Sequence, residues 1–427
     1  MSHRDLSDRE MRALAFVDER ELVRDLVALT EVPSISGSDA ECDIQHHLAK
    51  QLRSLDLDVD LWRIDLEETT SDPGFPGWEA ERTEAWGLVA TAPGTEDGGN
   101  DPALVLQGHV DVVPPGDLGL WQGAPFVPRV VGGAVHGRGT CDMKGGVVAN
   151  LAAARAVLAA GLDLPRSFGL HLVVGEEDGG LGAFATLRRG HRADACVITE
   201  PTSGTITTAN AGALTFELVV AGKATHASTA YAGVSAFERY LPLHAALADL
   251  QARRHASVDP LMAEYPAAYP LSIGRVTCGD WSSSVPDRLV AEGRLGVALD
   301  EDPADARTQL EEAIVEAAAA DPWLREHPPV VSWTGGQFAS GRYAGDDGSL
   351  HDLVSAAHRD VTRGPAPRER GAPYGSDLRL YNGAGIPTLH YGPGDVRLAH
   401  SPEESVPVAE LVTVTEALVL ALVRACS

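Results

Sequence analysis

The chain is poor in cysteine, in basic residues and in long apolar runs, and each shortage excludes a class of protein. Its five cysteines are scattered and odd in number, which argues against a disulfide framework and against a cysteine-based zinc site. The N-terminal segment lacks the apolar core of a signal peptide, and no later run approaches the length of a membrane span. These absences predict a cytoplasmic protein with no membrane partner.

Acidic residues greatly outnumber basic ones: 61 Asp and Glu stand against 34 Lys and Arg, a formal net charge of −27. Such a charge repels phosphate backbones and anionic lipid at long range, so nucleic acid is not expected as a partner. Solubility explains the excess of acid. The chain has 427 residues, of which 44% are hydrophobic. A single hydrophobic core rarely supports a chain of this length, so we expect two domains.

Segments with helix and strand spacing alternate over the first 200 residues. Helices are predicted at 19–30, 39–55 and 144–160, and strands at 57–61, 86–92, 103–107, 168–174 and 195–199. A stretch at 65–82, rich in acidic residues, Pro and Gly, is predicted to be an irregular insertion. Strands that alternate with helices predict the α/β class with a mainly parallel sheet. In such a sheet the residues that form a binding site lie at the ends of the strands.

The pattern changes near Gly212. Half-buried strands are predicted at 214–220, 271–276, 288–297 and 330–333, and helices at 234–254 and 303–320. This is the pattern of a compact α+β unit, and it interrupts the first domain because a further candidate site residue, His400, follows it. We therefore predict a catalytic domain made of 1–211 and 336–427, with an inserted lid domain at 212–335.

Five residues that bind metals in proteins stand where apolar runs give way to Gly or Pro. They are His109, Asp142, Glu177, Glu200 and His400. Imidazole nitrogen and carboxylate oxygen suit zinc and cobalt, and two divalent cations need a shared carboxylate with one or two further ligands each. The five residues supply that number. The pattern predicts a hydrolase centre with two divalent metal ions, zinc by preference, with cobalt and manganese as alternatives.

Two further acids near these ligands suit catalysis better than metal binding. A water held between two cations loses a proton near neutral pH, and a nearby carboxylate must carry that proton to the leaving group. Glu176 suits this role because successive side chains of an extended segment alternate, so it would point away from its neighbour Glu177. Asp111 lies two residues after His109 and would accept the second imidazole N–H without touching a metal.

Taken singly, these residues have simpler explanations. His109 alone would be a hydrogen-bonded histidine at a strand end, and the acids at 176–178 alone would form a solvated turn. The repetition of acids at the ends of apolar strands, with glycines beside them, favours a metal centre over surface decoration.

At these positions the chain resembles the zinc-dependent deacylase and carboxypeptidase family that includes acetylornithine deacetylase, succinyl-diaminopimelate desuccinylase, aminoacylase and glutamate carboxypeptidase. The resemblance covers nearly the whole chain in order. It rests on Glu-Val-Pro-Ser at 31–34, Gly-His-Val-Asp at 108–111, Gly-Arg-Gly-Thr-Cys-Asp-Met-Lys-Gly-Gly at 137–146, Gly-Glu-Glu at 175–177, Glu-Pro-Thr at 200–202 and Ala-His-Ser at 399–401.

The resemblance implies a role for each site residue. His109 and Glu200 would hold one metal, and Glu177 and His400 would hold the other. Asp142 would bridge the two. Glu176 would be the general base, and Asp111 would orient the first histidine. The inserted domain would be a lid, through which many members of the family form dimers.

The resemblance also implies residues that contact the substrate. His226 matches the histidine that polarises the scissile carbonyl, often from a partner subunit, and losing such an oxyanion donor costs about 2.7–4 kcal/mol. Arg294 matches an arginine whose fork fits a carboxylate, although Ser283 and Ser284 stand where the family commonly has Asn. Ser376 and Asp377 match a segment that lines the substrate cleft, where a helix N-terminus could help hold an anion.

Without the resemblance, His226 would be a solvated loop histidine and Arg294 a solvent-facing strand arginine. With it, we predict a metal-dependent amidohydrolase that cleaves an N-acyl amino acid or short peptide, most like acetylornithine deacetylase or succinyl-diaminopimelate desuccinylase. A metallo-dipeptidase or carboxypeptidase is the nearest alternative. A catalytically silent homologue that binds metal or amino acids is a further one. The expected partners are the small-molecule substrate and a second copy of the chain, bound through the lid domain.

Overall fold

The structure, a computed structural model, describes residues 6–96, 101–345 and 348–427. The chain forms two compact units. The first unit consists of Met1–Thr208, Tyr343–Arg370 and Leu380–Ser427, and the second unit consists of Ala209–Arg342 and Gly371–Arg379. In the described part of the chain, none of the helices has both the length and the apolar character needed to cross a bilayer.

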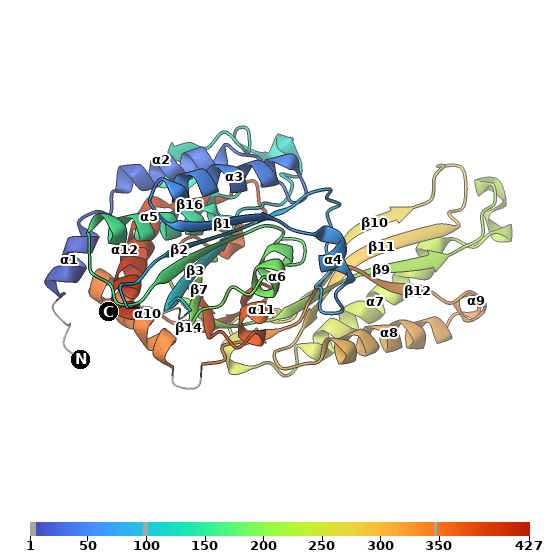
Figure 1. The fold of residues 1–427 in the computed structure, drawn as a ribbon. Coiled ribbons are helices and arrows are strands. Elements are labelled where there is room, and N and C mark those ends of the chain that lie inside the picture. The colour runs from blue at the N-terminus through green and yellow to red at the C-terminus, as the bar shows by residue number, and fades with distance from the viewer. Residues whose placement is uncertain (1–5, 97–100, 346–347) are drawn as a thin grey trace. The chain divides into compact units, whose positions relative to one another are not determined.

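The first unit is built on a mixed sheet with the strand order β1-β2-β6-β3-β7-β15-β8 (Figure 1). Its four central strands run parallel: β6 (Phe168–Val173), β3 (Leu104–His109), β7 (Cys196–Ile198) and β15 (Thr388–His390). Antiparallel strands flank them: β1 (Asp58–Arg63), β2 (Trp86–Ala92) and β8 (Ile206–Asn210). The short strand β14 (Glu369–Ala372) also pairs with β8, and the short strand β13 (Gly341–Arg342) pairs with Ala209 and Asn210 of β8, which belong to the second unit as it does. The predicted α/β class is confirmed, and the sheet is parallel where the candidate site residues follow its strands.

Four helices of the first unit bury apolar side chains in its core; the first three match predicted helices, and the fourth was not predicted. They are α2 (Glu19–Thr30), α3 (Asp39–Arg53), α5 (Gly145–Ala159) and α12 (Val408–Ala425). Helix α5 is buried on nearly all sides because it packs against both β3 and α12. Gly146 lets it begin beside the end of β7, since a Cβ there would lie 2.1 Å from the carbonyl oxygen of Thr199. This close approach brings the turn that carries Asp142 near the segment that carries Glu200.

The other elements of this part of the fold are α1 (Asp8–Leu14), α4 (Leu66–Ser71), α6 (Leu181–Arg188), α10 (Ser349–Thr362) and a small sheet of β4 (Arg129–Val131), β5 (Ala134–His136) and β16 (Ser405–Pro407). Helix α11 (Leu378–Gly383) begins in the second unit and ends in the first. The irregular structure predicted for 65–82 is wrong at its start, where α4 forms. The Asp65 side chain caps that helix by accepting the N–H of Glu68 at 3.0 Å.

The second unit is an antiparallel sheet, in the order β10-β11-β9-β12, with two long helices on one of its faces (Figure 1). Its elements are β9 (Gly212–Ala221), α7 (Ala236–Arg254), β10 (Leu271–Cys278), β11 (Arg288–Val297), α8 (Pro303–Ala319), the short α9 (Pro322–Glu326) and β12 (Val330–Phe338). Along β9, Leu214, Phe216 and Leu218 are buried and the residues between them are partly exposed. This alternation is expected for a sheet covered on one face, and the predicted α+β fold of the lid is confirmed.

The second unit also includes a segment from late in the chain, Gly371–Arg379. This segment packs on β12, because a Cβ at Gly375 would lie 2.6 Å from the Cβ of Phe338. The guanidinium of Arg379 lies 4.1 Å from the centre of the same phenyl ring. Ser376 and Asp377 therefore belong to the second unit, although both fall in the range 336–427 that was assigned to the catalytic domain. As a functional division, the predicted domain ranges stay a prediction.

Candidate active site

Strand ends carry the predicted ligands to one edge of the sheet of the first unit. β3 ends at His109, Glu200 lies two residues after β7, and Glu177 lies in the turn that follows β6. Because the carboxyl ends of parallel strands meet at one edge, the residues that follow them converge. His400 comes from the loop after the fourth parallel strand, β15, and Asp142 comes from the turn that precedes α5.

Asp142 lies between the two histidines. Its Oδ1 is 3.1 Å from Nε2 of His109, and its Oδ2 is 3.5 Å from Nε2 of His400. An oxygen of Glu200 lies 3.8 Å from the same nitrogen of His109, and an oxygen of Glu177 lies 3.0 Å from that of His400. Asp142 thus offers one oxygen to each of two ligand pairs, which is the arrangement that two neighbouring cations need.

Glu176 and Glu177 both face this cluster. The potential ligand atoms of His109, Glu176 and Glu200 lie within 4.8 Å of one another, and so do those of His109, Asp142 and Glu177. The extended backbone expected for the two acids is wrong, because residues 176–179 form a turn. A turn does not alternate its side chains as a strand does, so neighbouring acids can serve the same site.

The carboxylates of the cluster favour positive charge at both histidines. Glu177 is the main cause that raises the pKa of His400 to about 11, against the effect of burial and with help from Asp142. Burial disfavours a charged His109, but hydrogen bonds to Asp111 and Asp142 raise the pKa of His109 well above its usual value. The field that stabilises these imidazolium ions would also stabilise a bound cation. In donor type and in charge, the residues present fit divalent metal ions.

Asp111 supports the cluster in two ways, one of which differs from the expected contact. Nδ1 of His109 lies 2.9 Å from the main-chain oxygen of Asp111 but 3.6 Å from its carboxylate. The main chain is the closer partner because β3 ends at His109, so the strand does not continue through Asp111. The buried carboxylate instead accepts the main-chain N–H groups of Glu176 and Glu177, both at 3.2 Å, and the hydroxyl of Ser36 at 2.9 Å.

A buried charge cluster beneath the Glu176–Glu177 turn was not predicted. Arg82 lies 2.9 Å from Asp178 and 3.4 Å from Glu41. The carboxylate of Glu41 also accepts the main-chain N–H of Gly175 at 2.9 Å, which fastens the chain just before the turn. No sequence signal marks Arg82 or Glu41, because each is one charged residue among many and only the fold buries them together.

A second buried pair, Arg138 with Glu404, also escaped prediction. The carboxylate of Glu404 accepts the main-chain N–H of Asp142 at 3.2 Å. The sequence did carry a signal here, since Arg138 stands in the Gly-Arg-Gly motif at 137–139 and Glu404 follows the Ala-His-Ser motif closely. Arg138 is a cation and cannot bind a metal ion, and Glu404 is one of several acids in its segment, so the sequence does not show that the two side chains are buried together.

The sequence of this chain matches a known protein family. The sequence profile of Peptidase family M20/M25/M40 matches residues 105–424. The chain belongs to this family. The predicted resemblance is thereby confirmed, since the match includes every motif from the His109 segment to the His400 segment.

Two relatives and one solved structure show how this M20 chain compares. An N-formyl-4-amino-5-aminomethyl-2-methylpyrimidine deformylase of Halalkalibacterium halodurans is 28% identical over 97% of this chain and 96% of its own length. A succinyl-diaminopimelate desuccinylase of Gluconacetobacter diazotrophicus is 30% identical over 75% of this chain and 80% of its own length. The di-peptidase Dug1p of Saccharomyces cerevisiae shares the fold, with a TM-score of 0.78 at 14% identity over 100% of this chain and 99% of its own. The predicted enzyme class, a hydrolase that acts on amides, is confirmed.

In the second unit of this M20 chain, His226 is an exposed residue just before a short helical turn, Ala227–Ala232. Its Nδ1 accepts the main-chain N–H of Ser228 at 3.2 Å, so in a neutral imidazole the proton resides on Nε2. The main chain beside it is tied to the neighbouring hairpin, because the N–H of Ala227 donates to the carbonyl of Ser283 at 2.8 Å. His226 therefore presents a ring N–H donor from a restrained loop.

The predicted substrate residues Arg294, Ser376 and Asp377 belong to the same unit. The guanidinium of Arg294 is 5.5 Å from the centre of the Phe338 ring, within range of a cation–π contact. Ser376 and Asp377 are buried, and the hydroxyl of Ser376 accepts the N–H of Leu378 at 3.2 Å. The expected helix N-terminus is thus capped by the chain's own side chain, and α11 has only six residues.

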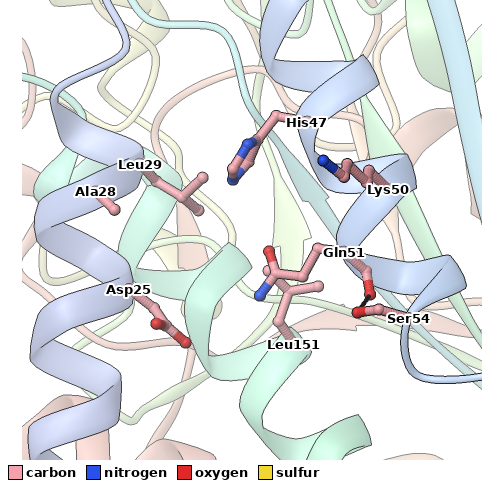
Figure 2. A pocket seen from close by; sticks show the side chains of 8 residues that line it. All are labelled: Asp25, Ala28, Leu29, His47, Lys50, Gln51, Ser54 and Leu151. Atoms are coloured by element: carbon pink, nitrogen blue, oxygen red, sulfur yellow. Dashed lines mark hydrogen bonds between the residues drawn. The ribbon is translucent and has the colours of Figure 1, made fainter.

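A cavity of about 330 Å³ opens between α2 and α3 in the first unit. Figure 2 shows His47, Lys50 and Gln51 of α3 on one side of this cavity and Asp25 and Leu29 of α2 on the other. Leu151 of α5 also lines it. None of the predicted ligands or substrate residues lines this cavity. It is therefore separate from the cluster around Asp142, and we do not assign the substrate to it.

Proposed function

We propose that this M20 chain is a two-metal amidohydrolase that cleaves the amide bond of an N-acyl amino acid or a short peptide. The observation that carries the proposal is the position of Asp142, whose two oxygens face different histidines at 3.1 and 3.5 Å. His109, Asp142 and Glu200 would hold one cation. Asp142, Glu177 and His400 would hold the other. Zinc suits these donors, and cobalt or manganese would also fit them.

Divalent cations of this kind supply Lewis acidity, which acidifies water and polarises a carbonyl oxygen. Proton transfer falls to the chain itself. Glu176, whose carboxylate lies within 4.8 Å of ligand atoms of His109 and Glu200, would accept the proton of the attacking water. The same carboxylate would return it to the departing amine nitrogen, which must leave as a neutral amine.

His226 would serve the carbonyl oxygen. Negative charge develops on that oxygen as the water adds, and the free Nε2–H of His226 is a donor for it. Since His226 belongs to the second unit, we infer that this unit, from the same chain or from a second copy, contributes a residue to catalysis.

Arg294 would bind the carboxylate of the amino-acid part of the substrate. A guanidinium offers two parallel N–H groups to two oxygens, and the guanidinium of Arg294 lies 5.5 Å from the centre of the Phe338 ring. Ser376 and Asp377 would line the substrate site. The hydroxyl of Ser376 accepts the N–H of Leu378, the first residue of α11, and so fixes the start of that helix. A substrate of this class therefore presents an amide at one end and a carboxylate near it.

A second candidate substrate comes from the deformylase that is similar over 97% of this chain. An N-formyl aminomethylpyrimidine carries an amide but no carboxylate, so Arg294 would have no group to pair with. Replacing Arg294 by Met separates the two. The KM for N-acyl amino acids should rise, whereas the KM for the formyl pyrimidine should not change.

The test of the proposal is a turnover assay on chelated protein to which Zn²⁺ or Co²⁺ is returned. The panel contains N-formyl, N-acetyl and N-succinyl amino acids, dipeptides and the N-formyl aminomethylpyrimidine. We expect activity to disappear with chelation, to return with metal, and to be greatest on an N-acyl amino acid. Preference for dipeptides would assign the chain as a dipeptidase or carboxypeptidase. Metal binding with no turnover of any compound would assign a catalytically silent homologue.

A homodimer through the second unit remains part of this proposal, as does a cytoplasmic location. Light scattering on the purified protein tests the first directly. A single-chain mass at working concentrations would mean that His226 serves its own chain.

A further inference from the structure

A buried ion pair joins two segments of the first unit that are 266 residues apart in sequence. The guanidinium of Arg138 donates to the carboxylate of Glu404 at 2.5 Å, and the two side chains are only 2% and 0% exposed. Arg138 also lies 5.1 Å from the centre of the Trp121 ring. Removing two charges from water is costly, and an ion pair is tolerated there only when further hydrogen bonds satisfy both ions. The further hydrogen bonds of this pair lead to the proposed metal ligands.

Each member of the pair contacts the main chain of a different ligand. The carboxylate of Glu404 accepts the N–H of Cys141 at 3.1 Å and the N–H of Asp142 at 3.2 Å. On the other side, Nη2 of Arg138 donates to the main-chain oxygen of His400 at 3.3 Å. One ion pair therefore ties the backbone of Asp142 to the backbone of His400.

The backbone of His400 needs such support. Its φ is 62°, in the left-handed region that residues with a side chain adopt only at a cost. A conformation of this kind persists where surrounding contacts hold it. The His400 side chain is half exposed, so packing around the ring restrains it little. The hydrogen bond from Arg138 to its carbonyl is a restraint on the strained residue itself.

The other half of the centre has a separate support. Asp111 contacts Nδ1 of His109 through its main-chain oxygen at 2.9 Å and holds the Glu176–Glu177 turn through its carboxylate. Changing Arg138 or Glu404 leaves these contacts in place. The two supports can therefore be disturbed one at a time.

We propose that Arg138 and Glu404 are positioning residues that set the separation of Asp142 and His400 and thereby the affinity for the second cation. The inference rests on the proposed two-metal centre. It predicts that breaking the pair weakens the binding of the two cations unequally. Of the three ligands of the second cation, Glu177, Asp142 and His400, two lose a main-chain contact that positions them. The cation held by His109, Asp142 and Glu200 keeps His109 on its separate support.

The test is stepwise binding of Co²⁺ to chelator-treated, full-length protein, followed by competition with a chromophoric chelator and by the visible absorption of bound cobalt. Glu404→Gln keeps the shape of the side chain and removes its charge. We expect its affinity for the second equivalent to fall about 10–100-fold, the usual effect of losing a partner that orients a ligand. The affinity for the first equivalent should fall by a smaller factor, because Asp142 alone among its three ligands contacts the pair.

The matched control is Glu10→Gln, in a buried ion pair of the same unit that touches no proposed ligand. Glu10 is 2% exposed and pairs with Arg424 at 2.6 Å. This variant should lose thermal stability but bind both equivalents as the wild type does. Equal weakening of both equivalents in Glu404→Gln, or the same weakening in Glu10→Gln, would overturn the inference by making the effect one of general stability.

Arg138→Lys decides the matter if Glu404→Gln does not fold. A lysine keeps the charge opposite Glu404 but lacks the second arm that reaches the carbonyl of His400. Its second equivalent should again be the weaker, and wild-type affinity for both equivalents would overturn the inference. If the wild-type protein itself binds fewer than two equivalents, the proposed two-metal function fails instead, so the two failures are distinct.

Discussion

The carboxylate of Asp111 holds the main chain of Glu176, whose N–H it accepts at 3.2 Å although the two residues are 65 positions apart. Its second oxygen accepts the N–H of Glu177 at the same distance. The main-chain N–H groups of Glu176 and Glu177 thus both donate to one buried carboxylate. Its residue, Asp111, lies two positions after the proposed ligand His109. The proposed base and its neighbouring ligand are positioned by a residue outside the proposed ligand set.

Replacing Asp111 by Asn should therefore disturb the turn. An amide has one oxygen, so it can accept one of the two N–H groups and must place its own NH2 against the other. We expect kcat/KM to fall about 10–100-fold. Ser36→Ala is the control, because it removes only the hydroxyl bonded to Asp111 at 2.9 Å and leaves both main-chain bonds. Equal losses in the two variants would speak against this role of Asp111.

Glu176→Gln should abolish most turnover while the metal content stays unchanged. Gln cannot accept and return a proton, and a positioned acid–base group contributes about 10²–10⁴-fold to the rate. Elemental analysis beside the turnover assay checks both parts of the prediction. Glu403→Gln, at an exposed position, is the control and should be fully active. An active Glu176→Gln enzyme would show that the base lies elsewhere.

His226→Ala should lower kcat much more than it changes KM. The loss of one donor to a developing oxyanion costs about 2.7–4 kcal/mol of transition-state stabilisation, which is about 10²–10³ in rate. His244→Ala on the exposed face of α7 makes the same change away from the site and should have no effect. If His226→Ala raised KM alone, the histidine would bind the substrate in its ground state.

His171 should make the first unit sensitive to acid. Burial lowers the pKa of this imidazole to about 3, whereas the unfolded chain binds the proton near its ordinary value of 6.5. As the pH falls below 6.5, His171 binds a proton in the unfolded chain but stays neutral in the folded one. The free energy of unfolding therefore decreases by about 1.4 kcal/mol per pH unit, down to the pKa of the folded state. This contribution is fully present above pH 6.5.

Urea unfolding of chelated protein at pH 7 and at pH 5.5 measures the effect. His171→Gln should reduce the stability lost between the two pH values by about 1.4 kcal/mol, because the titrating group is gone. Tyr381→Phe removes the hydroxyl bonded to His171 at 2.8 Å but keeps the buried imidazole, so it should retain the acid sensitivity. An unchanged pH dependence in His171→Gln would refute the prediction.

Elements with a strong local pattern could be predicted to the residue. Helix α2 and the strands β2 and β11 begin and end where their spacing indicated. A helical or alternating pattern over seven or more residues is a property of one segment, so it needs no knowledge of neighbours. His109 and Glu200 also needed little knowledge of neighbours, since His109 ends the apolar strand β3 and Glu200 lies two residues after β7.

Elements that exist only through distant partners could not be predicted. Ser405 of β16 pairs with His136 of β5, and both strands are three residues long. So short a segment carries no periodicity, and its strand conformation comes from pairing. The same holds for Gly371–Arg379, which joins the second unit because Gly375 and Arg379 pack on Phe338.

The amino-acid sequence by itself determined the fold class, the inserted α+β unit and the residue types of the site, because periodicity and the residue that ends a strand are local. Only the tertiary structure decided that Glu176 and Glu177 share a turn and that the Asp111 carboxylate accepts hydrogen bonds from its main chain. The same holds for the burial of Arg138 together with Glu404. The direction of a side chain and the desolvation of an ion depend on atoms that become neighbours only when the chain folds.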